Sequence, residues 1–144
     1  MKKTTSLILS IISIAILSCG EKQYEQTAIK DPNEVKPMAH MMRTMADYCD
    51  SMRIDIKNHK LVDSIRYPLM PFWTAEPTDS SVFENVFYTH AQNFAIAYRN
   101  LMANQEHQAE NYTLVINQCM ECHGIYCSGP LKRIKKLPLT YQEK

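Results

Sequence analysis

Glycine is scarce in this sequence, and neither sign of charge is in clear excess. Its 144 residues include only 3 glycines, and 16 Lys and Arg residues are balanced by 15 Asp and Glu residues. The shortage of glycine, together with abundant Met, Leu, Ala and Tyr, favours helices over a turn-rich β fold. The balanced charge argues against a nucleic-acid-binding protein, which normally carries a strong basic bias. Neither an internal repeat nor a convincing strand pattern is present, so we expect an all-α protein.

A long apolar run occurs only at the N-terminus. Lys2 and Lys3 precede the stretch SLILSIISIAIL, which is too short to span a bilayer comfortably but is typical of a secretory signal peptide. The stretch leads into ILSCG, which resembles a bacterial lipoprotein cleavage site, where the chain is cut before a cysteine that carries the lipid. We therefore expect residues 1–18 to be a signal peptide and Cys19 to anchor the chain in the bacterial cell envelope, facing the periplasm. The alternative is an ordinary signal peptide with Cys19 near the cut.

Two segments of different composition follow the signal peptide. Residues 19–32 are polar and show no apolar periodicity, which predicts a flexible tether. Residues 33–144 contain the periodic apolar patterns and end in a basic tail, and their length suits one domain with a modest core. We therefore expect a single helical domain that is tethered to a membrane.

Three segments of this domain have the apolar spacing of helices. The first ends at Asn58 and has its apolar positions alternately four and three residues apart, at Met38, Met42, Met45, Cys49, Met52 and Ile56. In the next, for which Thr78 or Asp79 is a candidate N-cap, the spaced residues are Phe83, Phe87, His90, Phe94, Ala97 and Leu101. The last begins near Glu110, and Gly129 in a left-handed conformation followed by Pro130 is expected to end it. Residues 61–67 predict a short helix between the first two, which gives a four-helix bundle with a short second helix.

The sequence CMECH lies on the last predicted helix. Cys119 and Cys122 are three residues apart, so a helix places both thiols on one face with His123 beside them. Two such thiols can form thioethers with the vinyl groups of a haem, and the imidazole can bind its iron. We therefore expect one covalent haem c, attached through Cys119 and Cys122, with His123 as the proximal iron ligand. Export of the chain agrees with this, because c-type maturation takes place outside the cytoplasm.

Two other kinds of site use the same residue types. A thioredoxin-like dithiol would require a strand before the motif and a βαβ context, and no such pattern is visible. A zinc site could use Cys119, Cys122, His123 and Cys127. Three of these four ligands would lie close together on one helix, which makes tetrahedral closure awkward. Both alternatives are therefore weaker than haem attachment.

On the side of the iron opposite His123, either a sixth ligand binds or the pocket is empty. Met38, Met42 and Met45 share the apolar seam of the first helix, and a thioether opposite a histidine raises the reduction potential of haem. A methionine stripe at helical spacing is also a common way to fill a core. The residues alone leave these two interpretations open.

The helix order and the place of CMECH resemble the class II cytochromes c, which include cytochrome c prime and its low-spin relatives. The resemblance covers about residues 33–127 and implies an antiparallel four-helix bundle with covalent haem on the C-terminal helix. In low-spin members a Met from a first-helix segment similar to HMMRTM binds the iron. This implies Met42 as the distal ligand, with Met38, Met41 and Met45 as the next candidates. In high-spin members an apolar residue takes that place, and the five-coordinate iron binds NO or CO.

The sequence departs from this family in three places. Members usually carry a basic residue four positions after the haem histidine, where this chain has Cys127. The chain continues through SGPLKRIKKLPL, whereas a typical member ends, and its second predicted helix is shorter. Members often dimerise through their first two helices. A homodimer is therefore possible for this chain, but its shorter second helix makes the homodimer a weaker implication of the resemblance than the fold.

Cys49 and Cys127 are left over after lipid and haem are assigned. An even pair in an oxidising compartment predicts a disulfide between them, and two separate buried thiols are the alternative. The basic tail, with Lys132, Arg133 and two further lysines, has several interpretations: a solvated tail, a partner for haem propionates, a docking site for an acidic redox protein, or a contact with lipid headgroups.

Together these patterns predict a membrane-tethered monohaem cytochrome that passes single electrons among exported redox proteins and turns over no substrate. A five-coordinate haem protein that senses or scavenges NO or CO is the main alternative. A structural zinc-binding lipoprotein is the third.

Overall fold

The described part of the chain is helical. A computed structural model describes residues 35–140, and no strand occurs in this range. The all-α prediction is therefore confirmed for these residues. The predicted signal peptide, tether and lipidated Cys19 lie outside the described residues.

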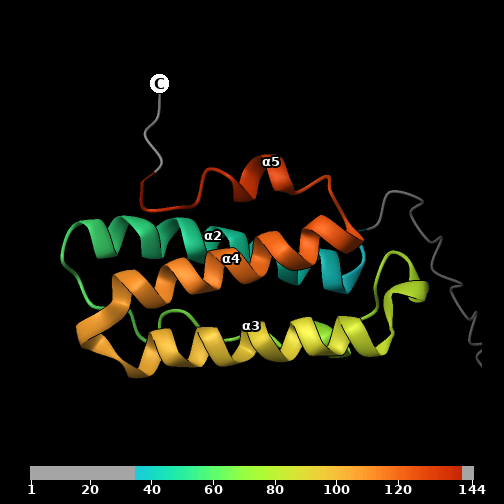
Figure 1. Ribbon diagram of the computed structural model, residues 1–144, viewed down its shortest axis with the longest axis horizontal. Coiled ribbons are helices and arrows are strands. Elements are labelled where there is room, and N and C mark those ends of the chain that lie inside the picture. Colours follow the sequence, from blue (N-terminus) through green and yellow to red (C-terminus); the bar gives the residue numbers. More distant parts are fainter. Residues whose placement is uncertain (1–34, 141–144) are drawn as a thin grey trace, which may run out of the picture. The chain divides into compact units, whose positions relative to one another are not determined.

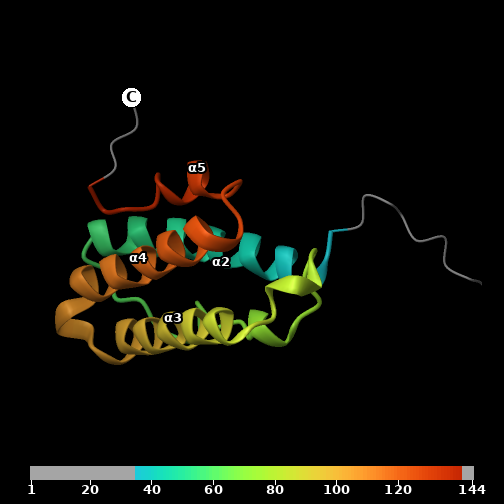
Figure 2. The ribbon, with the colours of Figure 1, turned by 45° about the vertical axis from the view of Figure 1, so that its right-hand side comes forward.

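Four helices pack together in this domain. They are α2 (Pro37–Lys57), α3 (Asn85–Ala103), α4 (Gln108–Tyr126) and the four-residue α5 (Leu131–Ile134), and three 3₁₀ turns lie between them: η1 (Phe72–Thr74), η2 (Ser80–Val82) and η3 (Gln105–His107). Figure 1 shows α2 and α3 running in the same direction and α4 running opposite to both. Figure 2 agrees, and in both views α5 lies on the side of α2 and α4 that faces away from α3.

The predicted second helix is not formed, which corrects the sequence analysis. Residues 61–67 contain a single turn, in which the amide of Tyr67 donates to the carbonyl of Asp63 at 3.0 Å. The Asp63 side chain accepts hydrogen bonds from the backbone amides of Ile65 and Arg66 at 2.8 and 3.0 Å, so these two amides have partners without a longer helix. Pro68 then disfavours a helical conformation at the residue before it and offers no amide for a further turn. The segment from 58 to 84 consequently returns along the helices as an irregular connection (Figure 1).

The helix ends agree with the sequence in part. Helix α2 ends at Lys57 with Asn58 as its C-cap, as predicted, and His59 adopts a left-handed conformation with φ of 57°. The Asp79 side chain caps η2 through the amide of Ser81, whereas α3 begins after Glu84 without a side-chain cap, so the N-cap prediction is wrong. The prediction that Gly129 adopts a left-handed conformation is also wrong, because neither glycine in residues 35–140 has a positive φ.

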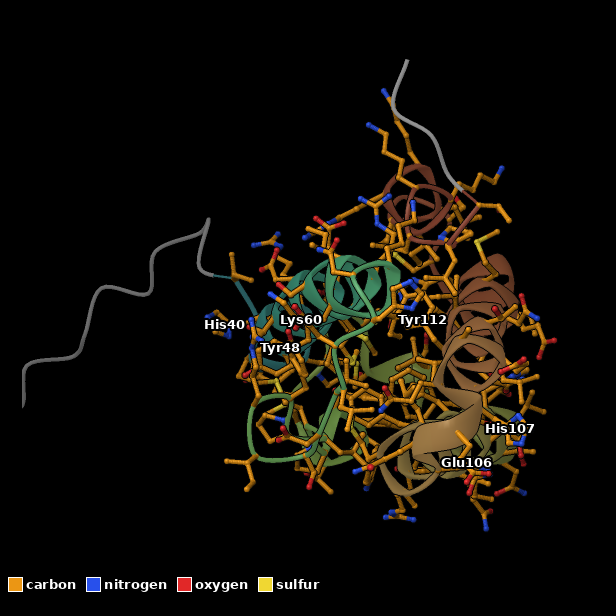
Figure 3. The ribbon with its side chains drawn as sticks, turned by 90° about the vertical axis from the view of Figure 1, so that its left-hand side faces the viewer. His40, Tyr48, Lys60, Glu106, His107 and Tyr112 are labelled. Atoms are coloured by element: carbon orange, nitrogen blue, oxygen red, sulfur yellow. The ribbon has the colours of Figure 1, made fainter. Side chains whose placement is uncertain are left out.

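Buried tyrosines connect the helices to the irregular segments. The hydroxyl of Tyr112, on α4, donates to the carbonyls of Cys49 and Leu137 at 2.9 and 2.8 Å, and the side chain is fully buried. Figure 3 looks along the helices and shows Tyr112 between α2 and α4. One side chain therefore ties together α2, α4 and the segment that follows α5.

Replacing Tyr112 by Phe should lower the free energy of unfolding by about 1 kcal/mol. The variant would lose the one hydroxyl proton that the carbonyls of Cys49 and Leu137 share, and a hydrogen bond contributes roughly 1 kcal/mol to stability. Urea unfolding of the wild type and the variant measures the difference. Tyr88→Phe is the matched control, because the Tyr88 side chain is 47% exposed. Equal stability of Tyr112→Phe and the wild type would show that these two bonds do not hold the C-terminal segment in place.

Candidate functional site

A cavity of about 490 Å³ opens among α2, α3, α4, α5 and the segment 77–82. This volume lies in the range of small-molecule and cofactor sites, which are commonly 300–1,000 Å³. From α4 and its C-terminal end, the wall includes Cys119, Cys122, His123, Tyr126 and Cys127. From α2 it includes Met38, Ala39, Met42, Arg43, Met45, Ala46 and Cys49. All residues of CMECH that were predicted to bind a cofactor thus line one cavity together with Met38, Met42 and Met45.

The three motif residues lie on the cavity side of α4. Cys119, Cys122 and His123 are each half-buried, and helical spacing of three and four residues keeps their side chains adjacent. The C-cap of the helix is Cys127, whose amide donates to the carbonyl of His123 at 3.3 Å. The end of α4 therefore holds the motif at the cavity wall.

The ring of His123 is oriented by a backbone carbonyl. Its Nδ1 lies 3.2 Å from the carbonyl oxygen of Cys127. A carbonyl oxygen only accepts, so Nδ1 is the protonated nitrogen and Nε2 keeps its lone pair. Burial lowers the pKa of His123, although the bond to Cys127 opposes this shift. The imidazole is therefore held neutral with Nε2 available, which is the form that binds a metal.

The two motif thiols have high pKa values. Burial, followed by the neighbouring Cys122, raises the pKa of Cys119 to about 12, and burial also raises the pKa of Cys122. Dithiol oxidoreductases need a lowered thiol pKa, since the thiolate is their nucleophile. These surroundings therefore do not support a thioredoxin-like dithiol.

Met38, Met42 and Met45 all line the cavity from α2. Met38 and Met45 are buried, and Met42 is half-buried. Met41 is also half-buried, but it does not line the cavity. The structure thus brings three of the four candidate distal ligands to the same space as His123 and leaves Met41 out of it.

The predicted disulfide between Cys49 and Cys127 is not formed in the structure. Cys49 is a buried free thiol on α2, and Cys127 is an exposed free thiol after α4. Both nevertheless line the cavity. The fold therefore places these two cysteines at one site without bridging them.

The predicted zinc ligands are not assembled into a cluster. Within residues 35–140, no group of three or more His, Cys, Asp or Glu side chains is arranged to hold a metal ion. The contact that Cys127 makes with His123 is through its backbone carbonyl. The four-ligand zinc site therefore gains no support.

The other histidines lie away from the cavity. His40 is exposed, and Figure 3 shows it at the outer edge of α2. His90 is half-buried on α3, with its ring 6.5 Å from that of Tyr126, and it does not line the cavity. His59 and His107 lie in turns at helix ends.

The wall formed by α5 and the segment 77–82 was not predicted. Pro130, Arg133, Ile134 and Leu137 line the cavity from the C-terminal side, and Pro77, Thr78, Asp79 and Val82 line it from the connection before α3. The sequence did contain a signal for α5, because apolar residues recur every third position at Leu131, Ile134 and Leu137. The segment 77–82 has no comparable periodicity.

Comparisons of the chain with known protein families, with curated proteins and with solved structures found no match. None of the helices within residues 35–140 has both the length and the apolar composition needed to cross a membrane.

Proposed function

We propose that this protein is a membrane-tethered monohaem c-type cytochrome that acts in single-electron transfer between exported redox proteins. The observation that carries the proposal is the cavity itself, which is lined by Cys119, Cys122 and His123 on α4 and by methionines of α2. An apolar cavity with a few converging polar groups is the usual form of a cofactor site. The tether and the lipid on Cys19 are part of the proposal.

The residues of the cavity fit a haem. Cys119 and Cys122 would form its two thioethers, because their thiols are three residues apart on the cavity side of one helix. His123 would be the proximal ligand through Nε2, since Nδ1 is engaged by the carbonyl of Cys127. When bound, the haem supplies an iron that accepts and returns one electron. The residues of the chain would position that iron and supply its ligands.

The distal ligand is proposed to be Met42. Met42 lines the cavity from the helix opposite His123, and so do Met38 and Met45, which remain the next candidates. Met41 receives no support as a ligand, because it does not line the cavity. If none of the three methionines binds iron, the alternative function applies: a five-coordinate haem protein that binds NO or CO.

Two arginines of the cavity wall suit the carboxylates of a haem. Arg43 on α2 and Arg133 on α5 are the cationic residues among those that line the cavity. A guanidinium can pair with a carboxylate through two parallel hydrogen bonds. Arg133 also forms an ion pair with Asp47 of α2, which fixes its position next to the cavity. These residues would hold the propionate side of the macrocycle.

We also propose that the fold is an antiparallel bundle of the class II type around a covalent haem. In this bundle the irregular segment from 58 to 84 takes the place of the second helix. Three long helices, the opposite direction of α4 and the position of CMECH near the end of α4 support it (Figure 2). The absent second helix removes part of the surface through which this family often dimerises, so a homodimer is not part of the proposal.

Covalent attachment is the property that tests the proposal. Protein produced in a host with c-type maturation should keep its haem during acid–acetone extraction and through a denaturing gel. Extraction of all colour from the protein would contradict thioether formation. A colourless protein that contains zinc would contradict the haem proposal and favour the structural alternative.

A further inference from the structure

A cationic surface covers the outer side of α5. We define the α5 cationic surface as the four exposed side chains of Lys132, Arg133, Lys135 and Lys136. The apolar residues of the same segment, Ile134 and Leu137, are buried and line the cavity. Residues 128–140 include no Asp or Glu, so no acid within this segment offsets the four cations. Arg133 lies at the boundary of this surface, because it also lines the cavity, whereas the three lysines are exposed and do not line it.

This surface is held in a fixed place next to the cavity. The hydroxyl of Tyr112 donates to the carbonyl of Leu137 at 2.8 Å, and Arg133 pairs with Asp47 of α2. Among the described residues, no carboxylate lies within ion-pair distance of the other three cations of the surface. Three lysine charges are therefore left to act on solvent or on a partner.

We propose that the α5 cationic surface is the docking surface for an electron-transfer partner that presents carboxylates. The inference rests on the proposed function, since it assumes a haem in the cavity. A partner seated on α5 would be separated from the cavity by the wall that Ile134 and Leu137 form. Opposite charges steer such a partner and raise its association rate, by roughly 10- to 1,000-fold in steered systems.

The position of the surface favours a protein partner over a lipid headgroup. The lysines belong to the segment whose buried residues Ile134 and Leu137 line the cavity, so a protein seated on them would lie next to the proposed haem site. A bilayer that covered α5 would instead shield this wall from any soluble redox protein. We therefore assign the surface to an anionic redox partner and treat lipid binding as an outcome of the test.

Stopped-flow oxidation of the reduced, haem-loaded full chain tests the assignment with small probes of opposite charge. Hexacyanoferrate(III) takes one electron from the reduced protein and becomes hexacyanoferrate(II), with no bond or proton transferred. Tris(phenanthroline)cobalt(III) is the cationic probe. The double variant K132E/K136E is compared with K57E/R99E, which changes the net charge equally at exposed positions of α2 and α3.

K132E/K136E should react about tenfold more slowly with hexacyanoferrate(III) and faster with the cobalt probe, and both effects should fade as salt shortens the screening length. K57E/R99E should change both rates much less. The inference would be overturned if K132E/K136E and K57E/R99E reacted at the same rate, or if neither reacted at a rate different from that of the wild type. Either result would leave the haem function intact. Unchanged rates with a loss of affinity for phosphatidylglycerol vesicles would assign the surface to lipid and also overturn it. Absence of haem absorption before mixing would instead contradict the proposed function.

Discussion

A chain with Cys119→Ser and Cys122→Ser should contain no covalently bound haem. The two thiols line the cavity together, and a serine hydroxyl does not form the thioether that attaches the vinyl group. Haem staining after denaturing electrophoresis and the intact mass of the purified protein both report the loss. We expect the wild type to carry the added mass of one haem and the double variant to carry none.

Cys127→Ser is the matched control for this experiment. Cys127 lines the same cavity, but its contact with the motif is made by the backbone carbonyl, which a serine retains. The control should therefore keep its covalent haem at a yield similar to that of the wild type. Loss of haem in Cys127→Ser, or staining of the double variant, would contradict the assignment of the two attachment residues.

Replacing Met42 by Ala should convert the reduced protein from a six-coordinate to a five-coordinate form that binds CO. The substitution would remove from the cavity wall the thioether of the residue proposed as the distal ligand. Because a methionine ligand raises the reduction potential, the potential should fall by on the order of 0.1 V. Absorption spectra with and without CO, and a potentiometric titration, measure both effects.

Met41→Ala is the control for Met42→Ala. The two residues are neighbours on α2, but only Met42 lines the cavity, so removal of Met41 should leave the spectrum and the potential unchanged. A CO response in Met38→Ala or Met45→Ala, together with none in Met42→Ala, would move the ligand to that residue. A wild type that already binds CO would contradict methionine ligation and favour the gas-binding alternative.

The parts of this fold that depend on short-range spacing could be predicted from the sequence. The seam of α2 repeats every three or four residues, and the buried side chains of Met38, Met45 and Cys49 follow it. The spacing within CMECH likewise required only that the segment be helical, which α4 is. In both cases residues a turn apart determine the local structure and the face they share.

The connection from α2 to α3 depends on contacts between distant residues, which spacing does not encode. The Gln108 side chain on α4 accepts from the amide of Val62 at 3.2 Å and donates to its carbonyl at 2.8 Å. The buried carboxylate of Asp55 accepts from the Tyr67 hydroxyl at 2.6 Å and pairs with Arg66 at 2.8 Å. These long-range bonds hold an irregular path where the sequence predicted a helix.

The packing of the C-terminal segment against the domain was not predicted from the sequence, for a different reason. Four cations among residues 132–136 suggested a solvated tail, and the apolar residues between them received too little weight. Ile134 and Leu137 are buried, with exposed fractions of 5% and 3%, so the segment is part of the domain and completes the cavity wall. A three-residue apolar period inside a basic stretch is the signal that would have found it.

An absorption spectrum of the full chain, made in a host with c-type maturation and recorded oxidised and dithionite-reduced, tests the central claim most directly. The account predicts a covalent haem whose sharp reduced bands do not change on addition of CO, which corresponds to six-coordinate iron held by His123 and a methionine of α2. A protein without haem absorption after such expression would contradict it.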